Sequence, residues 1–248
     1  MELKALVDYT RQLLQPERYA DYCPNGLQIE GESNVNKIVT GVTASMALLQ
    51  AAKAARADAV LVHHGYFWKN EDAAIVGIKR NRIKFLLENN ISLLAYHLPL
   101  DAHPDLGNNA QLAKKLEIDV QGWAGTQGLI GFGELGRALS LDEFSVQIHT
   151  KLQHKPLVLG DKGKQVQRVA WCTGGAQGYM QEAIDLGVDV FISGEVSEQN
   201  YHLAQESGVA YIAAGHHATE RYGVQALGAH LASQFGVAHE YIEIENPV

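Results

Sequence analysis

Apolar residues along the chain recur with two alternating spacings. Between residues 2 and 14 they recur every three or four positions, as on one face of a helix, whereas residues 37–43 form a short apolar run typical of a buried strand. Further strand-like runs are expected at residues 58–65, 91–97, 155–160, 167–175, 188–195, 209–216 and 239–246, and further helices at 45–57, 82–90, 138–152, 177–187, 198–208 and 218–236. This alternation predicts an α/β fold of two layered domains with largely parallel or mixed sheets.

The two halves of the chain also share local patterns. When residues 57–65 (ADAVLVHHG) are aligned with residues 188–196 (VDVFISGEV), Asp58 coincides with Asp189. Each half also has a histidine followed four residues later by an acid: His97 and Asp101, His216 and Glu220. We interpret this as an internal duplication. The alternative is that the turn residues common to α/β folds produce part of the match.

A Gly-rich segment at residues 122–144 separates the two halves and indicates a domain junction or the start of a second domain. We therefore expect one domain from residues 1–124 together with about 208–248, which holds the candidate site. A second α/β domain is expected from about 125–207.

Histidines gather where the predicted strands end. His63 and His64 end one strand, His97 ends the next, and His216 ends a later one. Ligands of open α/β sheets collect at the carboxyl ends of the strands, so we expect these side chains to meet in one crevice. Neighbours on a regular strand point to opposite faces, so His63 and His64 share a ligand only where the strand has ended.

Two acids accompany these histidines. Glu220 follows His216 by four residues, so the two share a face if a helix has begun there. Pro99 disfavours a helix, so Asp101 is expected to come from a loop.

The donor set contains imidazoles and carboxylates but no thiolate, which favours zinc, iron, manganese or nickel. Its members are His63, His64, His97, Asp101, His216 and Glu220. This exceeds the roughly three protein ligands of a mononuclear catalytic zinc site and fits two divalent ions ~3.5–4 Å apart that activate a water. Glu220 is the expected bridging ligand, and His217 is the candidate proton carrier.

The competing interpretation of a histidine at a strand end is a hydrogen-bonded loop residue. We assign that role to the remaining histidines: His103, His149, His154, His202, His230 and His239.

Weaker motifs leave alternatives open. Residues 173–178 (TGGAQG) fit either a phosphate-binding turn or a tight turn between strand and helix. Glu195 and Glu198 either face the crevice or stabilise the first turn of a helix. Trp68 and Tyr66 either stack on a planar ligand or pack in the core.

Composition limits the classes of function. The chain has 248 residues, of which 46% are hydrophobic, so a sizeable core is expected. Its formal net charge of −8 disfavours binding to nucleic-acid phosphate. No apolar run reaches the ~18 residues of a membrane helix, the first residues do not resemble a secretion signal, and the two cysteines, Cys23 and Cys172, fit a reducing cytoplasm.

Seven blocks in order between about residues 21 and 220 resemble the GTP cyclohydrolase I type 2 family, also called the NIF-three-like family. They are PNGLQIEG, GVTAS, HHGYFW, LPLDAHPDLGNN, RVAWCTGGAQ, FISGEVSEQ and GHHATE. The match covers nearly the whole chain and is to the short bacterial form, which lacks the central insertion of some relatives.

The resemblance implies a two-domain α/β protein with a dinuclear metal centre. It implies as ligands His63, His64, Asp101, His216 and Glu220, with His97 close to the motif. It also implies a homo-oligomer, a ring-shaped hexamer with sites facing the inner cavity.

Two classes of function are therefore expected. The first is a dinuclear metal-dependent hydrolase acting on a small molecule such as a nucleotide or a related heterocycle. The alternative is a non-enzymatic metal-binding adaptor or regulatory protein, since ligands alone do not establish turnover.

Overall fold

The computed structural model describes residues 1–248, and the chain divides into two compact units. The first contains Met1–Gly107 and Gly223–Glu245, and the second contains Asn108–Tyr222 and Asn246–Val248. None of the helices combines the length and the apolar character needed to cross a membrane.

The observed units differ from the expected boundaries near residues 124 and 208. Strand β5 (Ile118–Ala124) pairs with β6 (Ile130–Ser140), and β10 (Ala210–Ala213) pairs with β9 (Val190–Ser193). Because strand pairing decides which sheet a segment joins, residues 108–124 and 208–222 belong to the second unit.

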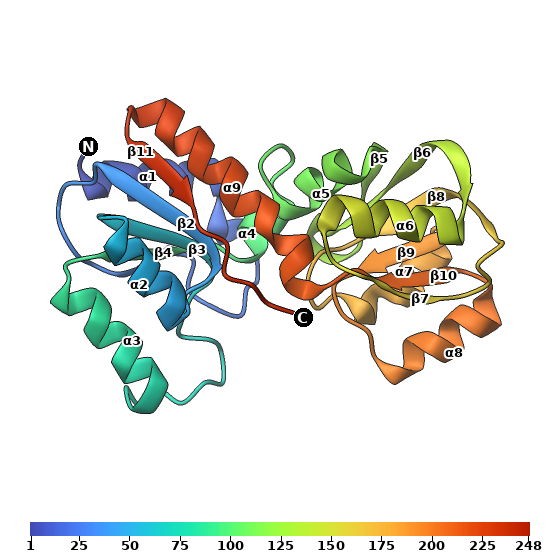
Figure 1. Ribbon diagram of the computed structural model, residues 1–248, viewed down its shortest axis with the longest axis horizontal. Coiled ribbons are helices and arrows are strands. Elements are labelled where there is room, and N and C mark those ends of the chain that lie inside the picture. The colour runs from blue at the N-terminus through green and yellow to red at the C-terminus, as the bar shows by residue number, and fades with distance from the viewer. The chain divides into compact units, whose positions relative to one another are not determined.

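The first unit is built on a five-stranded sheet in the order β1-β4-β3-β2-β11. Figure 1 labels β2, β3, β4 and β11 of this sheet. The strands are β1 (Gly26–Ile29), β2 (Lys37–Thr43), β3 (Ala59–His64), β4 (Ser92–Ala95) and β11 (Ala238–Tyr241). The helices are α1 (Leu3–Leu14), η1 (Pro16–Arg18), α2 (Met46–Ala54), α3 (Gly77–Glu88), α4 (Leu98–Ala102) and residues 223–235 of α9 (His216–Phe235). All pairings are parallel except that of the edge strand β1, as expected for alternating strands and helices.

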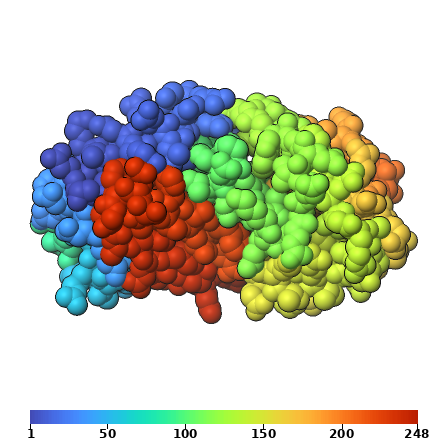
Figure 2. All heavy atoms as spheres, turned by 90° about the horizontal axis from the view of Figure 1, so that it is seen from above, coloured from blue at the N-terminus to red at the C-terminus, as the bar shows by residue number.

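Helices cover both faces of this first sheet. The alternation of side chains along β3 sends Val60 and Val62 into a cluster with α2 and α3, and sends Leu61 into a cluster with α1 and α9. Figure 2 shows the blue N-terminal and red C-terminal segments of this unit side by side, in agreement with a hydrogen bond between Tyr9 and His230. The first unit is thus a three-layer α/β/α arrangement.

The second unit is built on a six-stranded sheet in the order β5-β6-β8-β9-β10-β7. Besides the strands already given, it contains β7 (Leu157–Leu159), β8 (Gln165–Trp171), α5 (Asn108–Leu116), η2 (Thr126–Gly128), α6 (Leu141–Leu152), η3 (Gln177–Tyr179), α7 (Met180–Asp185), α8 (Glu198–Ser207) and residues 216–222 of α9. Strands β8, β9 and β10 are parallel. Helices α5 and α6 pack their apolar residues on one face of the sheet. The prediction of an α/β fold of two layered domains with largely parallel or mixed sheets is confirmed.

The two sheets share a substructure that supports the internal duplication. Each sheet contains three neighbouring parallel strands, β2 to β4 in one and β8 to β10 in the other. The third of these pairs with an antiparallel edge strand, β4 with β1 and β10 with β7. The Asp58 carboxylate accepts two backbone N–H groups near the start of β2, and the Asp189 carboxylate accepts two near the start of β8. The residues that the sequence alignment pairs therefore have the same structural role.

The Gly-rich segment at residues 122–144 lies within the second unit, and it is neither a domain junction nor the start of that unit. It forms most of the β5–β6 hairpin, whose register shifts between Val120 and Gly122. Side chains lie directly over its glycines: the Phe132 ring covers Gly122, and the Trp171 ring covers Gly131. Glycine is required here by close packing in a strand rather than by a loop.

Gly133 gives a test of this packing. A Cβ atom at this position would collide with the backbone carbonyl of Asp119, so we expect Gly133→Ala to lower the free energy of unfolding by about 1–3 kcal/mol. The melting temperature should fall by about 2–12 °C, as measured by calorimetry. Gly136 on the same strand has no atom within 4 Å of such a Cβ, so Gly136→Ala is the matched control. An equal effect of both variants would contradict the packing argument.

Candidate metal centre

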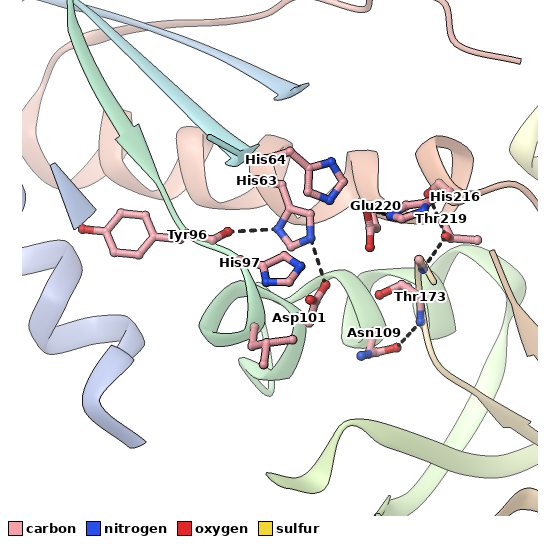
Figure 3. Close-up of polar contacts among 12 residues, drawn as sticks. His63, His64, Tyr96, His97, Asp101, Asn109, Thr173, His216, Thr219 and Glu220 are labelled. Carbon is pink, nitrogen blue, oxygen red and sulfur yellow. Dashed lines mark hydrogen bonds and ion pairs between the residues drawn. The ribbon is translucent and has the colours of Figure 1, made fainter. Parts of the chain in front are cut away.

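His63 ends β3 in the interior of the first unit, with no exposed surface. Its Nδ1 lies 2.9 Å from the Tyr96 carbonyl oxygen, and its Nε2 lies 3.4 Å from Oδ1 of Asp101 (Figure 3). Because a carbonyl oxygen only accepts, Nδ1 carries the proton and Nε2 of the neutral ring carries a lone pair. A buried lone pair facing a buried carboxylate is stabilised only by a cation, either a proton or a metal ion.

The rings of His63, His64 and His97 converge at the carboxyl end of the first sheet. The centroids of the His63 and His64 rings are 4.6 Å apart, and one nitrogen from each of the three histidines lies within 4.8 Å of the others. The expectation that His63 and His64 share a ligand where their strand ends is consistent with this geometry. His64 Nδ1 lies 3.2 Å from the Thr43 hydroxyl.

Asp101 lies in helix α4 rather than in a loop, so the expectation drawn from Pro99 was wrong. Proline occupies the first turn of α4, where its missing N–H leaves no hydrogen bond unmade. The backbone N–H of Asp101 donates to the His97 carbonyl, which ties the carboxylate to the end of β4.

Asp21, which the sequence did not indicate, holds His97 in place. Its carboxylate lies 2.7 Å from His97 Nδ1 and also accepts from the Leu98 N–H, the Asn25 amide and the Tyr22 N–H. Burial disfavours the charged carboxyl, but the hydrogen bond and charge of His97 and the other donors hold its pKa below the usual value. A carboxylate on Nδ1 fixes the tautomer that leaves Nε2 as a ligand, as in many metal sites.

We expect Asp21→Asn to lower the free energy of unfolding at pH 7 by about 1–3 kcal/mol. Asparagine replaces one acceptor oxygen with an amide nitrogen, which cannot accept the hydrogen bonds that the carboxylate accepts. The folded-state pKa lies below the unfolded value, so the carboxylate stabilises the fold above pH ~4 and loses this contribution as pH falls. The difference in the free energy of unfolding between wild type and variant, measured by urea unfolding, should therefore become smaller as the pH is lowered. Asp8→Asn, at a side chain that is 62% exposed, is the control. A cost that is independent of pH would argue against the ionised pair.

The second unit holds His216 and Glu220 at the start of α9. The helix begins at His216, so the predicted i, i+4 pair shares a face, and His216 Nε2 lies 3.0 Å from Oε2 of Glu220. His216 Nδ1 lies 2.7 Å from Oε1 of Glu195, which follows β9. Burial lowers the pKa of His216, but Glu220 and Glu195 together raise it to about 9.

The motif at residues 173–178 is a structural turn that supports Glu220. The N–H groups of Thr173, Gly174 and Ala176 already donate within the protein, and two of these bonds go to Asn109 and Thr219 (Figure 3). Gly174 has a φ of +68°, and a Cβ there would collide with the Glu220 carboxylate. The tight turn is therefore favoured over phosphate binding.

Of the acids and aromatic residues left open by the sequence, one of each kind lies at a candidate ligand and the other does not. Glu195 contacts a candidate ligand, whereas Glu198 is exposed and pairs with His202 one turn along α8. Tyr66 is buried and donates to the Ala44 carbonyl, as expected for the core, whereas the Trp68 ring lies against His64.

Several other histidines have the hydrogen-bonded role assigned to them. The pairs are His103 with the N–H groups of Asp105 and Leu106, His202 with Glu198, His230 with Tyr9, and His239 with Thr40. His217 is 7% exposed, and its backbone N–H donates to the Val248 carbonyl.

His216 does not end a strand of the same sheet as His63 and His97. Strand β10 belongs to the second sheet, so the single sheet edge expected from the sequence is replaced by two edges. Each edge carries part of the donor set: His63, His64, His97 and Asp101 in the first unit, and His216 and Glu220 in the second. We call these sets the first and second half-sites.

Both half-sites fit a divalent cation. Each combines a buried carboxylate with an imidazole whose Nδ1 is held by an acceptor and whose Nε2 faces that carboxylate. Nitrogen and oxygen donors without sulfur are suited to zinc, iron, manganese or nickel.

The fold and the half-sites define a class of α/β protein with two sheets and histidine–carboxylate clusters at the carboxyl edges of both. The chain belongs to the Duf34/NIF3 (NGG1p interacting factor 3) family, whose model matches residues 1–247. The family resemblance drawn from the sequence is confirmed.

Curated relatives and solved structures agree with this assignment. Proteins named GTP cyclohydrolase 1 type 2 homolog from Allochromatium vinosum and Pseudomonas aeruginosa are each 52% identical over 99% of this chain, and this match covers 97% and 98% of the two relatives. A structure titled protein ybgI, of unknown function, is 51% identical with a TM-score of 0.97 over 100% of both chains. The structure of TTHA1606 from Thermus thermophilus is 32% identical with a TM-score of 0.91, also over 100% of both chains.

Proposed function

We propose that the protein is a metal-dependent hydrolase whose dinuclear centre takes ligands from both half-sites. The proposed ligands are His63, His64, Asp101, His216 and Glu220, with His97 as a sixth. The observation that carries the proposal is the buried His63–Asp101 pair, in which a lone pair and a carboxylate face each other at 3.4 Å. Such an arrangement is costly without a cation and is common around metals.

Helix α9 is shared by the two units. Residues 216–222 of α9 belong to the second unit and carry His216 and Glu220, whereas residues 223–235 belong to the first. The duplicated substructure adds a second argument, because each copy supplies a histidine and an acid after its third parallel strand.

When bound, two divalent ions supply Lewis-acid charge and lower the pKa of a water, which provides a nucleophile at neutral pH. The residues of the chain hold and orient this centre. Glu220, at 3% exposure, is proposed as the bridging ligand, Asp21 and Glu195 orient two of the histidines, and His217 is proposed as the proton carrier.

The proposed substrate is a small molecule, a nucleotide or a related heterocycle. The curated relatives carry the words GTP cyclohydrolase in their name, which supports an electrophilic ring carbon as the point of attack; phosphorus is the alternative.

Two measurements test the proposal. Elemental analysis of protein purified without chelator should give about two divalent ions per chain; well under one ion, even after reconstitution, would exclude a dinuclear centre. Turnover should then be assayed on nucleotides, cyclic nucleotides and pterin precursors with manganese, zinc and iron. Metal binding without turnover on any substrate would favour a metal-binding adaptor or regulatory protein.

The hexameric ring remains a prediction. Sedimentation equilibrium should give a particle of six 27.1-kDa chains, and a monomer would contradict it.

A further inference from the structure

Two aromatic side chains lie beside the first half-site and are not explained by the core. The Trp68 ring is half-buried, with its centroid 5.9 Å from that of His64 and 5.1 Å from that of His97. The Tyr22 ring also contacts His97, with 6.3 Å between the ring centroids, and 56% of this residue is exposed.

The polar atoms of these two residues are available to a ligand. Neither the indole N–H of Trp68 nor the hydroxyl of Tyr22 makes a hydrogen bond within the protein, whereas the neighbouring Tyr66 hydroxyl donates to the Ala44 carbonyl. Buried aromatic residues of the core usually satisfy such groups. Tyr66 therefore belongs to the core, and Trp68 and Tyr22 form a separate surface.

The chain holds this surface in a fixed arrangement. The backbone N–H of Lys69 donates to the Tyr22 carbonyl, which joins the two loops that carry the aromatic residues. The side chain of Gln28 accepts from the Tyr66 N–H and donates to the Tyr66 carbonyl. Phe67 has a φ of 66°, which is costly for a residue other than glycine and persists only where surrounding contacts impose it.

We propose that Trp68 and Tyr22 recognise a planar heteroaromatic ring on the ligand of this site. The proposal rests on the proposed function in that the ring belongs to the substrate, but ring binding itself requires no turnover. Stacking on an aromatic side chain tolerates different bases, and the two free donors can bind ring nitrogen or oxygen acceptors. A purely protective role, in which Trp68 only shields the histidines from solvent, is the competing explanation.

The test compares ligands that differ only in the ring. Guanosine 5′-monophosphate and adenosine 5′-monophosphate are titrated by calorimetry into the full-length, manganese-loaded protein, alongside ribose 5-phosphate. The wild type should bind at least one nucleotide more tightly than ribose 5-phosphate. Trp68→Leu should weaken nucleotide binding by about 5- to 100-fold and leave ribose 5-phosphate binding and metal content unchanged.

Matched variants separate stacking from shielding. Trp68→Phe keeps an aromatic face and should retain most of the affinity, and Tyr22→Leu should show a smaller loss than Trp68→Leu. Tyr201→Leu, at a tyrosine that is 52% exposed on α8, should have no effect. Equal nucleotide affinity in wild type and Trp68→Leu, or loss of metal and of both kinds of ligand together, would overturn the proposal, as would a wild type with no preference for nucleotides. Ring binding that persists without turnover would reject only the hydrolase.

Discussion

Glu220→Gln should weaken binding of divalent metal by at least about 100-fold, beyond the 10- to 100-fold loss typical of residues that only support a ligand. Glutamine keeps the size and one carbonyl oxygen of glutamate but removes the charge that attracts a cation. At 3% exposure no water replaces that charge, and His216 Nε2, 3.0 Å away in the wild type, would lose its carboxylate. Inductively coupled plasma analysis and competition with a chelating dye measure the content and the affinity.

Asp105→Asn is the matched control for this experiment. Asp105 lies four residues after Asp101 but is exposed and precedes helix α5, where an acid stabilises the helix N-terminus. The control should keep the metal content of the wild type, and circular dichroism should show both variants folded. A folded Glu220→Gln protein with full metal content would show that the GHHATE motif does not bind metal.

Removal of metal should lower the melting temperature by about 8–16 °C. Metal at ~1,000 times its dissociation constant stabilises a folded protein by about 4 kcal/mol, and each kcal/mol corresponds to about 2–4 °C in a chain of this length. The buried carboxylates Asp101 and Glu220 contribute to the tight metal binding behind this figure, because they face imidazole nitrogens that a cation neutralises.

Differential scanning calorimetry before and after dialysis against EDTA, with zinc or manganese added back, measures this shift. The Glu220→Gln variant should show a much smaller difference between the two states. If metal-free and metal-loaded wild type melt at the same temperature, neither half-site binds metal in the folded protein.

Local sequence patterns predicted the elements of the fold better than their assembly. The apolar run at residues 37–43 is β2 with the same bounds. Ser45 caps α2 by accepting the Leu48 N–H, a role that serine favours at helix N-termini. The β5–β6 hairpin was missed because its glycines resemble loop residues, and only contacts with Phe132 and Trp171 reveal why they are needed. Pairing between strands depends on residues far apart in sequence, which local periodicity does not report.

In the candidate site, too, local spacing predicted some residues and missed one that depends on the fold. The spacing of His216 and Glu220 predicted a shared helical face because both residues lie on one turn. Asp21 carried no comparable signal, since it lies 76 residues before His97 and outside any periodic pattern. A lone acid in a loop becomes recognisable only when the fold brings it against a histidine.

The division of α9 between the two units has a consequence for synthesis on the ribosome. The core on one face of the first sheet includes Val224, Leu227 and Leu231 from α9, packed with Leu3 and Leu6 from α1. The 138 residues from 108 to 245 must be added before the first unit has all its parts, which takes roughly 7–28 s at bacterial and eukaryotic rates of translation. During that interval the second unit is able to fold from residues 108–222, which lack only its last three residues, 246–248. The apolar face of the nascent N-terminal region stays uncovered until α9 is made, and it is the part of the chain most exposed to aggregation and to chaperone binding.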